Sequence, residues 1–88
     1  MNFVLWNENV AVFGASFVLE RYPELIAKRY KLTTLPADGS ALIDEIGRKR
    51  GCLQRGGKVD RHKAADIFIH EFRTGAIGRI SLERPGDD

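Results

Sequence analysis

Apolar residues recur along the chain at the three- and four-residue spacing that places side chains on one face of an α-helix. The first stretch with this spacing covers residues 8–21, and its bulky apolar residues are Val10, Phe13, Phe17 and Val18. Small residues stand between them, where they would let a second helix approach closely. We therefore predict a buried first helix, with these bulky residues on its inner face.

Two further stretches repeat the helical pattern between recognisable boundary residues. The second helix is predicted over residues 23–30, because Pro23 is favoured in a first helical turn. The third is predicted over residues 41–50, where either Asp38 or Ser40 can cap the free amides of its first turn. Gly51 is expected to end it.

A fourth helix is predicted over residues 61–74, with Asp60 as its N-cap and Gly75 at its end. Its apolar stripe consists of Ala64, Ala65, Phe68, Ile69 and Phe72. After it, residues 76–83 alternate apolar and polar positions, which favours an extended segment lying across the helices. The whole pattern predicts an all-α fold, a small bundle of about four helices with a short extended C-terminal segment.

Length and composition favour one compact domain over residues 1–88, with a core over about 8–83 and frayed ends. The chain has 88 residues and 43% apolar content, enough for one hydrophobic core and too few for two. Its single cysteine excludes an internal disulfide, which fits a cytoplasmic protein. The longest apolar run, residues 10–19, is shorter than the roughly 20 residues that cross a bilayer, so no membrane partner is expected.

Positive charge is concentrated in one part of the chain. Residues 48–63 carry half of the 14 lysines and arginines against a single carboxylate, a local net charge of +6 in a chain whose total is +2. The seven cations are Arg48, Lys49, Arg50, Arg55, Lys58, Arg61 and Lys63. Such asymmetry is typical of a surface that binds a polyanion.

Cations in the last turn of a helix are stabilised by the helix dipole, which would explain two or three of these charges without any ligand. An acidic protein surface or a role in solubility would account for the rest as well, but nucleic acid is favoured. Gly51, Gly56 and Gly57 lack side chains and would let backbone approach a phosphate chain. Because no aromatic residue interleaves with the cations, we expect contact with phosphates and RNA shape rather than base stacking.

The same segment does not carry a nucleotide-binding loop. The stretch GCLQRGGK has Cys52 where a P-loop requires its first glycine and Val59 where it requires serine or threonine. His62, Asp66 and His70 recur every four residues, but the two histidines would lie about 12 Å apart along a helix, too far to share one ion. Neither a metal site nor a catalytic residue is predicted, and Cys52 is expected to serve as a small apolar residue.

Three spaced motifs resemble the C-terminal domain of the ribosome biogenesis GTPase A family. They are RYPELIAKRYKL, IGRKRGCLQRGGKVDRHKAADIFI and EFRTGAIGRISLE, in this order. The resemblance implies a circularly permuted GTPase followed by a helical domain similar to the ANTAR fold. It also implies that this domain binds ribosomal RNA during late assembly of the large (50S) subunit.

The GTPase motifs of that family are absent from these 88 residues, which contain no P-loop, guanine-specificity motif or switch sequence. The chain is therefore expected to be a fragment of a larger GTPase, and its apolar residues 3–6 to have faced the neighbouring domain. GTP and magnesium are expected only in that absent domain. The chain itself is predicted to be no enzyme and to need no cofactor.

The candidate RNA contacts come from two sources. The motifs of the resemblance imply Arg48, Lys49, Arg50, Lys58, Arg73 and Arg79. Local charge adds Arg55, Arg61 and Lys63. Gly47, inside the third helix, is expected to serve close packing or close approach of RNA.

The alternative function is that of a protein-interaction domain. In this alternative, Ile77, Ile80 and Leu82 dock on the GTPase domain and the cations face an acidic ribosomal protein.

Overall fold

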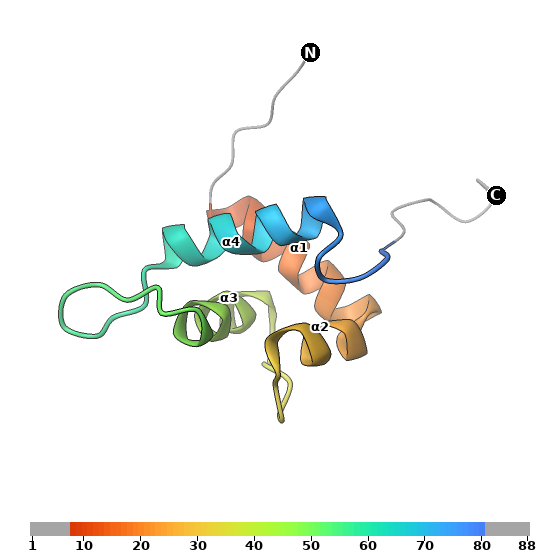
Figure 1. Ribbon diagram of the computed structural model, residues 1–88, viewed down its shortest axis with the longest axis horizontal. Coiled ribbons are helices and arrows are strands. Elements are labelled where there is room, and N and C mark those ends of the chain that lie inside the picture. The colour runs from red at the N-terminus through yellow and green to blue at the C-terminus, as the bar shows by residue number, and fades with distance from the viewer. Residues whose placement is uncertain (1–7, 81–88) are drawn as a thin grey trace, which may run out of the picture.

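Helix boundaries follow the capping residues of the sequence. The computed structural model describes residues 8–80, and within this range it contains four α-helices and no strand (Figure 1). They are α1 (Glu8–Arg21), α2 (Pro23–Tyr30), α3 (Gly39–Lys49) and α4 (Arg61–Thr74). The predicted all-α bundle is confirmed. Residues 3–6 and the outer part of the predicted extended segment, residues 81–83, lie outside the described range.

Side-chain and backbone caps explain where the helices begin and end. Of the two candidates for α3, Asp38 is the N-cap: its carboxylate accepts a hydrogen bond from the Ala41 N–H at 2.8 Å. Asp60 likewise accepts from the Lys63 N–H at 3.1 Å at the start of α4. Gly75 ends α4 in the left-handed conformation with φ +83°. Helix α3 begins two positions earlier than predicted, at Gly39.

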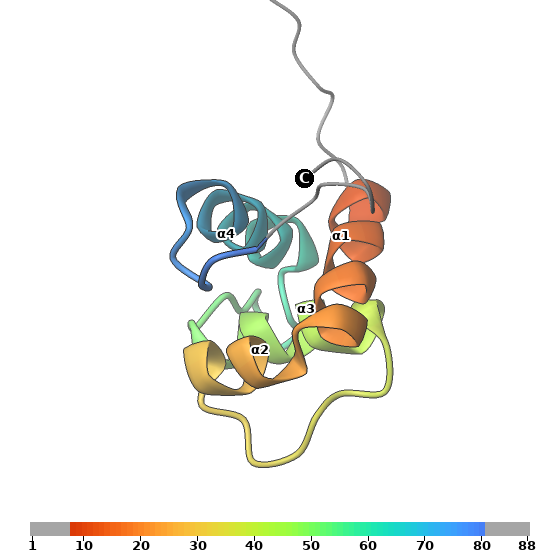
Figure 2. The same ribbon diagram turned by 90° about the vertical axis from the view of Figure 1, so that its right-hand side faces the viewer.

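The core lies where α1, α3 and α4 meet. Helix α1 packs against both α3 and α4, α3 also packs against α4, and α2 contacts α1 after a sharp turn (Figure 2). The largest fully buried side chains are Phe68, Ile26, Leu42, Ile43, Ile46 and Val18. Cys52 is 3% exposed, so its predicted role as a small apolar residue is confirmed. No helix among residues 8–80 is long and apolar enough to cross a membrane.

Phe13 is an exception to the predicted inner face of α1. It is 78% exposed, whereas Ala11, Ala15 and Val18 are completely buried. Helix α1 is apolar on nearly all sides, so the spacing of its apolar residues does not determine which face turns toward the core. The close approach of α3 selects the small residues, because a side chain at Gly39 would collide with the backbone of Val12. The larger Phe13 therefore faces outward.

Gly47 allows a second close approach, between α3 and the start of α4. A methyl group at this position would lie 2.5 Å from Val59 Cγ1 and 3.3 Å from Ala64 Cβ. Of the two roles that we expected for Gly47, the structure supports close packing. After α4 the chain folds back onto the bundle: Ile77 is buried and Ile80 is packed against the core. Gly78 faces the side chain of Leu25 on α2.

Candidate nucleic-acid interface

The glycine-rich segment between α3 and α4 forms an ordered arm that projects from the bundle (Figure 1). The Gly57 N–H donates to the Gln54 carbonyl at 2.9 Å, and the Gln54 N–H donates to the Lys58 carbonyl at 2.7 Å. Gly56 has φ +89°, as a type II turn requires at its third position. Leu53 and Val59 form an antiparallel bridge below the turn. The arm thus places Arg55 at the tip of a tight turn.

Three of the predicted cations on or beside this arm are exposed: Arg55, Lys58 and Lys63. Within residues 8–80 none of the three has an ion pair with a carboxylate. Lys63 stands in the first turn of α4, just after the capped end. These side chains are therefore available to an external anion.

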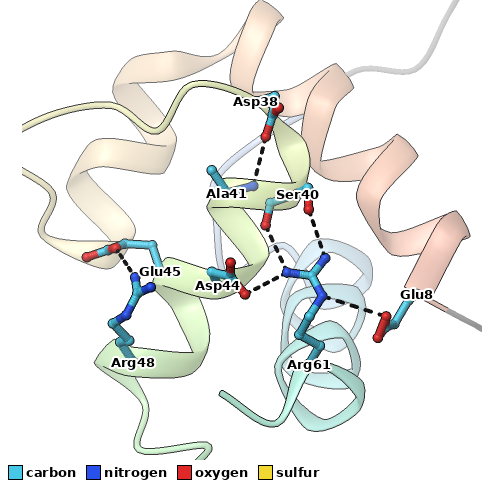
Figure 3. Close-up of polar contacts among 8 residues, drawn as sticks. All are labelled: Glu8, Asp38, Ser40, Ala41, Asp44, Glu45, Arg48 and Arg61. Atoms are coloured by element: carbon cyan, nitrogen blue, oxygen red, sulfur yellow. Dashed lines mark hydrogen bonds and ion pairs between the residues drawn. The ribbon is translucent and has the colours of Figure 1, made fainter. Parts of the chain in front are cut away.

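Arg61 has a different environment, because its guanidinium joins three helices (Figure 3). It lies 2.6 Å from Asp44 Oδ1 and 3.6 Å from Glu8 Oε1. It also donates to the Ser40 hydroxyl at 3.0 Å and to the Ser40 carbonyl at 3.2 Å. These contacts fix α4 against α1 and α3. Arg48, on the exposed side of α3, forms a surface pair with Glu45 at 2.9 Å.

Arg50 is directed toward α4, although 31% of its side chain remains exposed. Its guanidinium donates two hydrogen bonds to the Glu71 carboxylate, at 2.5 and 3.2 Å. Glu71 also accepts from the Tyr30 hydroxyl at 2.8 Å and from Arg29 at 3.2 Å. Glu71 is only 6% exposed, and a carboxylate is rarely buried to this degree unless it is paired. Three donors from α2 and the end of α3 hold it in place.

The protonation of Glu71 follows from these contacts. Burial by itself would raise the pKa of its carboxyl group, but the hydrogen bonds from Arg29, Arg50 and Tyr30 outweigh burial and lower the pKa to about 2. Glu71 is therefore ionised at neutral pH. Burial, together with the hydrogen bond to Glu71, raises the pKa of the Tyr30 hydroxyl, which consequently remains a donor.

Seven of the nine predicted contact residues line three separate pockets, whereas Arg55 and Lys63 line none of the three. Arg48, Lys58 and Arg61 line a pocket of about 520 Å³ that also contains Glu8, Asp44 and Asp60. Lys49 and Arg50 line a pocket of about 360 Å³ between the ends of α2 and α3. Arg73 and Arg79 line a third, at the C-terminal end of α4. Since α4 has 14 residues, about 20 Å separates its two ends.

Sequence reasoning missed two cations of the second pocket, Arg29 and Lys31, and the carboxylate of Glu71 behind it. The run KRYK at positions 28–31 was a usable signal, since it places three cations in four positions at the end of a predicted helix. The sequence carried no signal for Glu71, because its partners come from distant positions in the chain.

Metal-ligating groups do not gather in the described part of the chain. His62 Nε2 and Asp66 Oδ2 lie 3.7 Å apart on the exposed side of α4. No group of three or more histidine, cysteine, aspartate or glutamate side chains among residues 8–80 could hold an ion.

Comparison with known proteins adds relatives to this geometry. No family model matches the chain. It is 45% identical over 80 residues to ribosome biogenesis GTPase A of Bacillus licheniformis, which covers 91% of the chain and 28% of that relative. The same protein of Bacillus pumilus is 45% identical over 78 residues, and that of Thermotoga maritima is 34% identical over 70 residues. The chain belongs to the ribosome biogenesis GTPase A family. The family predicted from the three motifs is thus confirmed.

The chain spans only about 28% of the length of the Bacillus relatives of ribosome biogenesis GTPase A, as expected for the C-terminal domain of such a protein. The match to the Thermotoga relative covers 80% of the chain and 26% of that protein. Most of each ribosome biogenesis GTPase A therefore corresponds to no residue of this chain.

Proposed function

We propose that the chain is an rRNA-binding domain of a GTPase that acts in late assembly of the large (50S) ribosomal subunit in the cytoplasm. The observation that carries this proposal is the ordered arm between α3 and α4, which presents exposed cations on a hydrogen-bonded backbone. Its relatives are named for ribosome biogenesis, which supports a ribosomal partner.

The arm suits recognition of an RNA backbone. Arg55 and Lys58 extend from a turn whose backbone is already fixed, so fewer degrees of freedom are lost on binding than with a flexible loop. Lys63 extends the charge onto the first turn of α4. Phe68 and Phe72 stack on each other within the bundle, with ring centroids 5.9 Å apart, so they are not offered to bases. Contacts to phosphates would position the domain on folded rRNA.

Catalysis belongs, in this proposal, to the part of the parent protein that the chain does not span. GTP and magnesium would bind there, and this domain would hold the GTPase on the subunit precursor. The chain itself would need neither GTP nor magnesium to bind RNA.

The alternative, a docking domain for the GTPase part, has less support from the bundle. Ile77, one of its three proposed contact residues, is 4% exposed and belongs to the core. Ile80 is also packed against this core, and Leu82 lies outside the described residues. The Ile80→Asp variant separates the alternatives: RNA affinity should survive in it if the cations carry binding.

The decisive experiment measures binding of the 88-residue chain to large-subunit rRNA by fluorescence anisotropy at several salt concentrations. Each phosphate contact should contribute about −0.7 to −0.9 to the slope of log affinity against log salt. The double variant Arg55→Gln and Lys58→Gln should flatten the slope by roughly two contacts. Arg21→Gln, at the far end of α1, is the control for the loss of a single charge away from the arm. Lack of binding at low salt, or binding independent of salt, would exclude the proposal.

A further inference from the structure

The C-terminal ends of α2 and α3 converge on a pocket of about 360 Å³ lined by Arg29, Tyr30, Lys31, Lys49 and Arg50. None of these five residues is acidic, and four of them are cations. The one carboxylate among residues 8–80 in contact with them, Glu71, is buried behind Arg29 and Arg50. One carboxylate balances only one of four positive charges, so the pocket keeps a strong positive potential.

Two of the four cations are held in fixed orientations. Arg50 lies over the Tyr30 ring, 5.3 Å from its centroid, while Glu71 accepts its hydrogen bonds. Arg29 contacts the same carboxylate at 3.2 Å. The Arg50 side chain is nevertheless 31% exposed and that of Arg29 is 36% exposed. Glu71 therefore holds both guanidinium groups at the edge of the pocket while leaving part of each accessible.

Lys31 provides an independent observation. It is the only non-glycine residue among positions 8–80 with a positive φ, +56°. Lys31 follows the last residue of α2, as Gly75 follows the last residue of α4. In each case the N–H of the residue after it donates to the carbonyl five residues earlier, from Leu32 to Ala27 and from Ala76 to Glu71. Glycine is the usual residue there, because a side chain is strained in the left-handed conformation. The backbone conformation therefore does not explain why a lysine, rather than a glycine, stands at position 31.

The Lys49 ammonium group lies at the same corner and donates to the Lys31 carbonyl at 3.2 Å. This bond caps the end of α2, so Lys49 has a structural role. Lys31 has none of this kind: its backbone makes the cap, and its exposed side chain lines the pocket.

We propose that this pocket binds a phosphate group of the RNA backbone, with the Lys31 and Lys49 ammonium groups and the exposed edges of Arg29 and Arg50 as donors. Glu71 acts as a positioning residue for the two arginines. The inference rests on the proposed function and adds α2 to the RNA surface, since none of the nine contact residues predicted from the sequence lies on α2.

The test uses Lys31→Gly and Lys31→Asn, because both residues accept the left-handed conformation and neither carries charge. The thermal unfolding midpoint should be unchanged or raised by a few degrees, since strain is relieved. Affinity for large-subunit rRNA at low salt should fall about 3- to 10-fold, and the salt slope should lose about 0.7 to 0.9, the value for one phosphate. Lys28→Gln, an equal charge change one turn earlier outside the pocket, should leave affinity nearly unchanged.

The outcomes separate this inference from the proposed function. If the unaltered chain fails to bind RNA, both are wrong. If it binds, and the Arg55 and Lys58 variants weaken binding while both Lys31 variants do not, only the pocket is excluded. Equal losses in Lys31→Gly and Lys28→Gln would also overturn it, because they would indicate a diffuse charge effect.

Discussion

Arg50 Nη1 lies 2.5 Å from Glu71 Oε2, although the two residues are 21 positions apart. The pair joins the end of α3 to the last part of α4, and Tyr30 and Arg29 bring α2 to the same carboxylate. Helix α2 contacts the rest of the bundle mainly through α1. The polar cluster therefore anchors α2 to α3 and α4, and its removal should loosen the whole corner of the fold.

Removing the charge of Glu71 should destabilise the protein strongly. In Glu71→Gln, two guanidinium groups and the Tyr30 hydroxyl lose an ionised acceptor, at a cost of about 2–4 kcal/mol in the free energy of unfolding. Chemical denaturation followed by circular dichroism measures this loss. Glu45→Gln is the control: its surface pair with Arg48 should contribute less than about 1 kcal/mol. Similar losses in both variants would contradict the assignment of Glu71 as a buried anchor.

Acid should destabilise the protein through the same carboxylate. Its pKa is about 2 in the folded state against 4.5 in the absence of these contacts, so the unfolded state binds the proton first as pH falls. The contribution is complete above pH 4.5, declines below it and is lost near pH 2, a total of about 3 kcal/mol. Unfolding free energies between pH 7 and pH 2 should fall less steeply in Glu71→Gln. Parallel curves for the two proteins would refute this origin.

The sequence predicted the helices well because their causes are local. Asp38, Asp60 and Gly75 act on backbone atoms within one turn, and Pro23 acts on its own turn. The rotation of α1 was not predictable in the same way. Phe13 faces solvent because Gly39, 26 positions later, brings α3 against the small residues of α1.

The candidate site was predicted only in part for a similar reason. A charge count along the chain found the arm, but it could not separate the exposed Arg55 from Arg61, whose partners lie on α1 and α3. Nor could it associate Lys31 with Lys49, because that contact depends on how α2 packs. Composition therefore locates a basic segment, whereas packing decides which of its cations remain available.

Gly14 and Gly47, two of the glycines within helices, should respond oppositely to replacement by alanine. Replacing glycine within a helix gains up to about 1 kcal/mol from helix propensity. At Gly14 the new methyl would meet Phe68 at 3.5 Å, an ordinary contact, so Gly14→Ala should raise stability. At Gly47 it would lie 2.5 Å from Val59, and overpacking should lower stability by a net of about 1–2 kcal/mol. Thermal unfolding of both variants tests this, and stabilisation by Gly47→Ala would argue against the close contact.

Variants of Arg61 and Arg55 should distinguish a cation that stabilises the fold from a cation that binds RNA. Arg61→Gln removes the link among α1, α3 and α4 and should lower the unfolding free energy by about 1–2 kcal/mol. Its RNA affinity, measured at a temperature where the variant is fully folded, should stay within about twofold of the original, since the guanidinium is already occupied. Arg55→Gln should do the reverse: unchanged unfolding, because Arg55 is exposed at the turn, and several-fold weaker binding with a flatter salt slope. The contradicting outcome is a folded Arg61→Gln variant that binds RNA as weakly as Arg55→Gln. In that case the ion pairs of Arg61 would have to open on RNA binding, and the distinction between the two roles would fail.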